Sequence, residues 1–191
     1  PSHHLGAAGA ALHPVKPIAA VLDANILYPP TLRDMAVALA LEGLYQPKWS
    51  EEILEEAQRN LARHIAPETA QQRIDNLRDV LPEAMVDDYA QFLAGLTNDP
   101  KDLHVVAAAL KGNASIIVTG NLRDFHPLPS GVTAQSPDDF LCGFLGRTDA
   151  ILASLERVRT NWPKPWPPHE RLLKQLATFA PQFANHIRSE L

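Results

Sequence analysis

Oxygen-bearing side chains lie at the ends of two short apolar segments of the chain. They are Asp23 and Asn25 after residues 17–22, and Thr119, Asn121 and Asp124 at the end of residues 114–119. Ligands of open parallel sheets bind beyond the carboxyl ends of the strands, so both segments are expected to meet at one edge. Carboxylates gathered in one cleft repel one another unless a cation lies between them or some protonate. Mg²⁺ and Mn²⁺ prefer such hard oxygen ligands.

The chain lacks the glycine-rich loops that bind nucleotide phosphates in many parallel sheets. Asp23 is followed by Ala-Asn-Ile-Leu, with no G-x-G-x-x-G or G-K-[ST] pattern. We therefore expect a divalent-metal site at the sheet edge rather than a dinucleotide or ATP site.

The elements that position these residues can be predicted from hydrophobic periodicity and chain breakers. Strands are expected at 17–22, 114–119 and near 132–135, because these runs are short and apolar. Helices are expected at 31–44, 50–61, 67–77, 82–96, 100–111 and from 136 to about 161. Four prolines in 162–168 interrupt the helical pattern, and two short helices follow. Alternating strands and helices predict a parallel sheet covered by helices.

Further carboxylates lie near the N-termini of two predicted helices. Ser50 is a good cap for an amphipathic helix, but periodicity alone does not distinguish Glu52, Glu55 and Glu56 as functional residues. At the second start, Asp99 is suited to cap a helix that has Pro100 at its first position and an acid, Asp102, in its first turn. Each of these acids also has an ordinary structural role available, as a cap, a dipole partner or a surface charge.

Composition narrows the class of protein. The 191 residues are 46% hydrophobic and 20% charged, which is typical of a globular chain with a real core. The single cysteine, Cys142, cannot form an intramolecular disulfide, and no apolar run is long enough for a membrane helix. We expect a cytoplasmic protein without a membrane anchor, whose residues 1–16 form a flexible lead-in.

Charge is distributed unevenly along the chain. Residues 1–139 carry 18 acidic and 10 basic side chains, a net charge of −8, whereas residues 140–191 carry 4 and 7, a net charge of +3. Phosphate affinity comes from Lys and Arg, so an acidic body argues against nucleic-acid binding through a broad basic face alone. If the protein acts on phosphates, a cation is expected to help.

Four ordered blocks of sequence resemble one family. They are Leu22-Asp-Ala-Asn25, Ser50-x-x-Ile-Leu-Glu-Glu56, Asp99-Pro-Lys-Asp-Leu-His-Val-Val-Ala-Ala-Ala109 and Ile117-Val-Thr-Gly-Asn-Leu-Arg-Asp-Phe125. Their order and spacing are similar to those of PIN domains, in particular the VapC-type ribonuclease toxins. The resemblance implies a three-layer α/β/α domain over 17–140 with a mostly parallel sheet, followed by a C-terminal helical extension over 141–191.

The resemblance also implies a set of site residues. Asp23 matches the first acid of the family, Glu56 the acid on the helix, and Asp102 the acid before the aliphatic run. Many relatives have an aspartate where this chain has Asn121, so we take Asp124 as the fourth acid, with Asn121 assisting. Asn25 and Thr119 match orienting or phosphate-contacting positions.

The function implied by the resemblance is metal-dependent cleavage of RNA by a water activated with Mg²⁺ or Mn²⁺. A homodimer and a cognate DNA-binding antitoxin are implied as well. Two alternatives stay open: a catalytically silent PIN-like module that binds RNA or protein, and a haloacid-dehalogenase-like phosphatase. The phosphatase would usually need a second acid two residues after its aspartate nucleophile, where this chain has Asn25.

The role of the extension is also open at this level. Trp162 and Trp166 are expected mainly to pack, although Arg157, Arg159 and Lys164 nearby would allow contact with RNA. Histidines 104 and 126 are expected to have ordinary surface or packing roles, because neither lies in a metal-ligand spacing.

Overall fold

The computed structural model describes residues 17–191, so the predicted lead-in over 1–16 lies outside the described residues. A parallel sheet forms the centre, with strand order β2-β1-β3-β4. Its strands are β1 (Ala19–Leu22), β2 (Gln46–Lys48), β3 (Ile116–Val118) and β4 (Thr133–Gln135). The two inner strands are those whose ends carry Asp23 and Thr119, so their neighbouring positions follow directly from the strand pairing.

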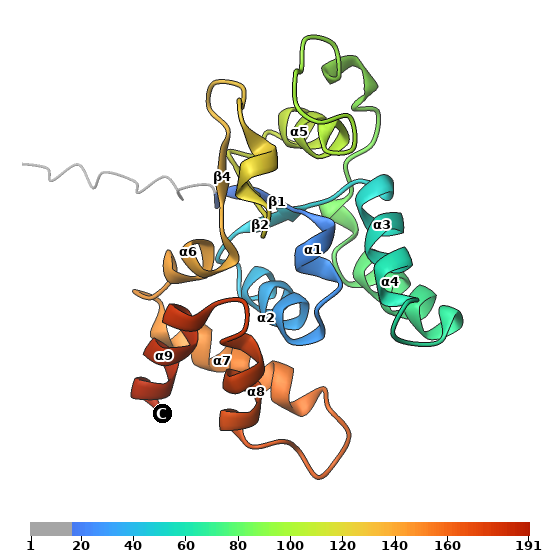
Figure 1. The fold of residues 1–191 in the computed structure, drawn as a ribbon. Coiled ribbons are helices and arrows are strands. Elements are labelled where there is room, and N and C mark those ends of the chain that lie inside the picture. Colours follow the sequence, from blue (N-terminus) through green and yellow to red (C-terminus); the bar gives the residue numbers. More distant parts are fainter. Residues whose placement is uncertain (1–16) are drawn as a thin grey trace, which may run out of the picture.

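Helices cover the sheet and continue beyond it. Those of the sheet domain are α1 (Ala24–Leu27), α2 (Pro30–Leu41), α3 (Glu51–Leu61), α4 (Pro67–Val80), α5 (Leu103–Lys111) and α6 (Pro137–Cys142). Three short 3₁₀ helices are η1 (Pro82–Ala84), η2 (Ala90–Phe92) and η3 (Leu122–Phe125). Figure 1 shows α5 on one side of the strands and α2 on the other, which confirms the predicted three-layer arrangement.

The extension forms a further helical layer behind α2. It comprises α7 (Thr148–Thr160), α8 (His169–Leu176) and α9 (Pro181–Glu190). Helices α7 and α8 pack on α2, and α9 packs on α6 and α8 (Figure 1). One continuous cluster of buried apolar side chains runs from Val21 in the sheet to Leu155 and Phe183 in the extension. Within residues 17–191, no helix is long and apolar enough to cross a membrane.

Three helix predictions differ most from the structure. The helix expected from 136 to about 161 is broken after Cys142, so that it forms the separate helices α6 and α7. The segment predicted as a helix over 82–96 contains only η1 and η2, because Asp88 has a positive φ of 54° and Met85 forms a bridge with Trp49. The helix predicted from Pro100 begins at Leu103 instead, and Asp99 accepts a hydrogen bond from the Lys101 N–H in the turn before it. This shift places Asp102 at the helix N-cap, beside the sheet edge.

Candidate active site

The ends of β1 and β3 are held together by a buried polar network around Asp23. The Asp23 carboxylate accepts hydrogen bonds from the Ala24 N–H (2.7 Å), the Asn25 amide (2.7 Å) and the Thr119 hydroxyl (2.7 Å). The Thr119 hydroxyl oxygen accepts in turn from the Asn25 amide (3.1 Å) and the Asn121 N–H (3.0 Å). Asp23 is only 6% exposed, so its rotamer is fixed by these partners.

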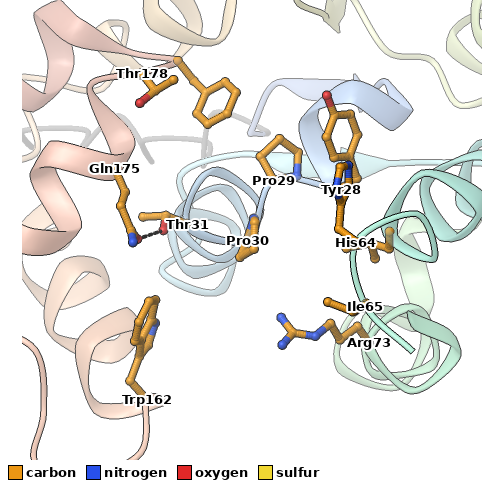
Figure 2. A pocket seen from close by; sticks show the side chains of 12 residues that line it. Tyr28, Pro29, Pro30, Thr31, His64, Ile65, Arg73, Trp162, Gln175 and Thr178 are labelled. Carbon is orange, nitrogen blue, oxygen red and sulfur yellow. Dashed lines mark hydrogen bonds between the residues drawn. The ribbon is translucent and has the colours of Figure 1, made fainter. Parts of the chain in front are cut away.

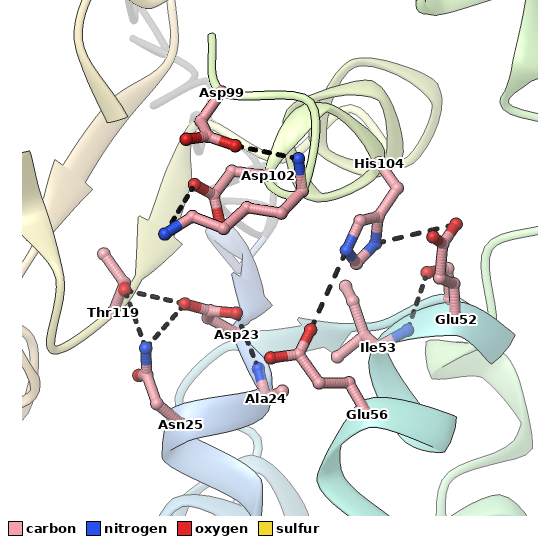
Figure 3. A network of polar contacts seen from close by, with 12 residues as sticks. Asp23, Ala24, Asn25, Glu52, Ile53, Glu56, Asp99, Asp102, His104 and Thr119 are labelled. Carbon is pink, nitrogen blue, oxygen red and sulfur yellow. Dashed lines mark hydrogen bonds and ion pairs between the residues drawn. The ribbon is translucent and has the colours of Figure 1, made fainter. Parts of the chain in front are cut away.

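A carboxylate from a second element points toward this network. Glu56 is on α3, whose start is capped by the Ser50 hydroxyl as predicted, and its carboxylate is turned toward Asp23 and His104 (Figure 3). The Glu56 side chain is 42% exposed, and its Oε2 lies 3.9 Å from His104 Nε2. Burial raises the pKa of Asp23, and the Glu56 charge raises it further, against the hydrogen bonds from Thr119 and Ala24.

The third carboxylate, Asp102, lies at the N-terminus of α5. Its side chain is 15% exposed, and its Oδ2 is buried without a hydrogen-bond partner in the described residues. Burial, together with the charges of Asp124, Asp23 and Asp99, raises the pKa of Asp102 to about 6, although Lys101 opposes the shift. An unpartnered buried carboxylate oxygen is costly unless something binds it.

One cavity of about 280 Å³ gathers these groups. It is lined by Asp23, Asn25, Glu56, Asp102 and Asn121, together with Tyr28, Asn60, Arg63, His64 and Lys101. The predicted acids on β1, α3 and α5 therefore meet in one place. Asp124 is outside the cavity lining and accepts a hydrogen bond from Lys101 Nζ at 3.1 Å, whereas Asn121 faces the cavity.

Two further residues belong to this neighbourhood: Lys101, which was not singled out from the sequence, and His104, for which an ordinary surface or packing role was expected. Lys101 Nζ lies between Asp124 and Asp102, at 3.1 and 3.9 Å from their carboxylate oxygens. His104 is buried between Glu52 and Glu56, each 3.9 Å from one ring nitrogen, and burial lowers its pKa. The sequence places Lys101 directly beside Asp102 and His104 two residues later, but nothing in their spacing identified either role.

The donor set fits a hard divalent cation. In the arrangement described for residues 17–191, no three His, Cys, Asp or Glu side chains form a preformed metal site. Nevertheless, Asp23 and Asp102 both have raised pKa values, Asp102 Oδ2 is unpartnered, and the nearby cation Lys101 compensates only part of the negative charge. Oxygen ligands with these properties are suited to Mg²⁺ or Mn²⁺.

The comparison with known families decides the class of the domain. A model of the PIN domain matches residues 19–123, which is more than half of the chain and includes Asp23, Glu56 and Asp102. The chain belongs to the PIN domain family.

Relatives of this PIN domain can be described individually. The chain is 36% identical over 107 residues to the putative ribonuclease VapC50 of Mycobacterium tuberculosis (strain ATCC 25618 / H37Rv), an alignment that covers 52% of this chain and 62% of that protein. The matched region thus spans less than two thirds of the relative. This chain is also similar to a chain in the crystal structure of VapBC2 from Rickettsia felis bound to a DNA fragment from their promoter. That match has 19% identity, a TM-score of 0.46, and covers 62% of this chain and 98% of the other.

Proposed function

We propose that this PIN domain is a metal-dependent endoribonuclease of the VapC toxin type. The observation that carries the proposal is the meeting of Asp23, Glu56 and Asp102, from three separate elements, in one cavity. The similarity to a putative ribonuclease over 107 residues supports the same activity. Mg²⁺ or Mn²⁺ bound here would activate water and neutralise charge on the phosphate.

The residues of the chain have distinct tasks in this proposal. Asp23 and Asp102 would be the main metal ligands, and Glu56 would hold the metal directly or through water. Asp124 lies outside the cavity lining and is paired with Lys101, so it would contribute only through water. Asn25 and Thr119 orient the Asp23 carboxylate, to which both donate hydrogen bonds of 2.7 Å. Asn121 faces the cavity, where its amide is available to a phosphate oxygen. No side chain is needed as a nucleophile.

The direct test compares cleavage of RNA by the purified protein with Mn²⁺, with Mg²⁺ and with EDTA. Wild-type protein should cut in the presence of either metal and stop in EDTA, and Asp23→Asn should reduce the rate by at least about 100-fold, as loss of an electrostatic group in an active site typically does. Cleavage that continues in EDTA or in Asp23→Asn would exclude the metal mechanism.

A catalytically silent RNA- or protein-binding module is the second candidate. Asn121 favours it, because many members of the family have an acid there, and so does the ion pair of Lys101 with Asp124 at 3.1 Å. The silent module would show no cleavage with either metal while still binding RNA or a protein partner.

The resemblance to VapC toxins extends the proposal to partners. We propose a homodimer and a DNA-binding antitoxin that inhibits cleavage. The first observation to make is whether an adjacent short reading frame encodes a DNA-binding protein. Co-expression of that protein with this chain should yield a stable complex with reduced ribonuclease activity, and failure of the two to co-purify would contradict this part of the proposal.

A further inference from the structure

A second cavity, of about 440 Å³, adjoins the candidate active site. It lies where the sheet domain meets the extension, and Tyr28 and His64 line both cavities. Its lining residues come from the α1–α2 junction, from the end of α3 and from the extension, which contributes Trp162 and Phe179. Figure 2 shows Trp162 across the cavity from His64 and Ile65. A molecule that reaches from the carboxylates past Tyr28 therefore enters this cavity.

The chemistry of the cavity fits a flat ring with polar edges. Three aromatic side chains, Tyr28, Trp162 and Phe179, are among its lining residues. The Arg171 guanidinium lies over the Trp162 ring, 5.4 Å from its centroid. Polar groups stand at the margins, including Gln175, whose side-chain oxygen accepts a hydrogen bond of 2.7 Å from Thr31. Unstacked nucleobases bind on aromatic side chains with polar groups at their edges.

Each of the two adjoining cavities has an arginine among its lining residues. Arg63 lines the active-site cavity and Arg73 the second one, and within residues 17–191 neither forms a hydrogen bond or ion pair through its side chain. Figure 2 shows the Arg73 guanidinium directed into the space between Ile65 and Trp162. Arg73 also lines a third cavity of about 470 Å³, whose other two arginines already have acidic partners: Arg33 is buried and paired with Asp34 at 2.9 Å, and Arg157 is paired with Glu42 at 3.1 Å. Arg63 and Arg73 are therefore the arginines available to an RNA phosphate backbone.

We infer that the active-site cavity and the second cavity, which share Tyr28 and His64 and are here called the seam groove, bind single-stranded RNA next to the cleavage site. One base stacks on Trp162 in the second cavity, and Arg73 contacts the adjoining phosphate. The inference rests on the proposed function and gives the extension a task in it, which is to supply one wall of the substrate path. An apolar protein segment is the alternative occupant. It would pack against the aromatic side chains but would leave the Arg63 and Arg73 guanidinium groups without acidic partners.

The test measures binding of a fluorescein-labelled single-stranded RNA octamer by fluorescence anisotropy. It uses an Asp23→Asn background, which the proposed function predicts to bind RNA without cutting it. Trp162→Ala should weaken binding by about tenfold, as loss of one base–aromatic stack does, and Trp162→Phe should restore most of the affinity. Arg73→Ala should weaken binding and reduce the slope of log K against log salt by about 0.7, the value for one phosphate contact on a single strand.

Trp166→Ala is the matched control. Trp166 belongs to the same proline-rich segment, is 40% exposed and is not part of the seam groove, so binding should change less than twofold. Equal affinities for Trp162→Ala, Arg73→Ala and Trp166→Ala would overturn the inference. So would unchanged RNA binding combined with lost binding of a protein partner, because the groove would then be a protein site.

The outcome for the groove is separate from the outcome for the proposed function. Metal-dependent cleavage that Trp162→Ala and Arg73→Ala leave unchanged, in rate and in KM, refutes the groove alone. Absence of cleavage by the wild-type protein refutes the nuclease, while the anisotropy measurement still supports or overturns RNA binding by the groove.

Discussion

Among single residues, the candidate site contains a buried carboxylate that destabilises the folded protein when it is ionised. Asp102 has a buried oxygen without a partner, and its pKa is raised to about 6 by burial and by neighbouring carboxylates. A carboxyl whose folded pKa exceeds its unfolded value of about 3.9 costs stability once it is ionised. The cost is absent below about pH 4, develops as pH rises to about 6, and is complete at pH 7.

Asp102→Asn should therefore stabilise the protein at neutral pH while impairing its activity. We expect a gain of about 1 kcal/mol in the free energy of unfolding at pH 7.5 in EDTA, a value reduced to allow for solvent screening. The gain should disappear at pH 4. Urea unfolding at the two pH values measures both quantities, and a variant that is less stable than wild type at pH 7.5 would show that Asp102 has a structural role instead.

Three of the four expected acids lie together in the structure, and the fourth does not. Asp23, Glu56 and Asp102 were predicted from spacing and family resemblance, and they line one cavity. The orientation of Asp124 toward Lys101 was not predictable, because it depends on where α5 begins, and that helix starts at Leu103 rather than at Pro100. Side-chain partners that cross between elements, such as Lys101 and Asp124, have no signature in a single sequence.

Among the helices and strands, the sequence predicted an element correctly when that element contained its own cap, first-turn acids and apolar stripe. Helix α3 has a serine cap, acids in its first turn and an apolar stripe, and it was predicted to the residue at its C-terminal end. Strand β2 was missed, because Gln-Pro-Lys is short and polar; its place at the sheet edge tolerates the proline. The helix expected over 82–96 did not form, although Met85, Tyr89 and Phe92 have helical spacing, because the Met85 backbone bridges to Trp49.

The extension is attached by a contact that sequence analysis did not detect. Asp138 on α6 is 8% exposed, and its carboxylate accepts the Gln182 N–H (3.1 Å) and the Phe183 N–H (3.0 Å) at the start of α9. The α9 N-terminus has no cap of its own from Ala180. A charged acceptor at a helix N-terminus stabilises both the free N–H groups and the helix dipole.

Asp138→Asn should lower the free energy of unfolding by about 1–2 kcal/mol, because hydrogen bonds to a charged acceptor are replaced by weaker neutral ones. Asp149→Asn, an exposed acid in the first turn of α7, is the control and should change it by no more than about 0.5 kcal/mol. Chemical denaturation measures both variants. Equal stabilities would mean that α9 is held by apolar packing alone.

At the scale of the whole molecule, the sheet domain and the extension share one core. Leu155 of α7 is 2% exposed and belongs to the same apolar cluster as Val21 of β1. The extension should therefore unfold together with the sheet. The sequence predicted separate helical segments after residue 140, but their packing on α2 depends on tertiary contacts that periodicity does not encode.

Unfolding should accordingly be a single transition. In a Trp162→Phe/Trp166→Phe background, Trp49 is the sole tryptophan, and it lies buried next to β2. Its fluorescence and the helical circular dichroism signal should give the same urea midpoint. Leu155→Ala should shift both midpoints equally, with a loss of about 2–5 kcal/mol in the free energy of unfolding. Separate midpoints would show that the extension is an independent unit.

We propose that carboxylates from three elements form one metal-dependent site for cutting RNA. Two neighbouring glutamates on α3 provide the sharpest test of this proposal. Glu56 faces the cavity, whereas Glu55 is exposed and outside it. The measurement is the cleavage rate of one defined single-stranded RNA across a range of Mn²⁺ concentrations. Glu56→Gln should cut at least about tenfold more slowly or need more Mn²⁺, with Glu55→Gln equal to wild type. Equal rates for both variants, or cleavage independent of Mn²⁺, would rule out the proposed three-carboxylate metal site.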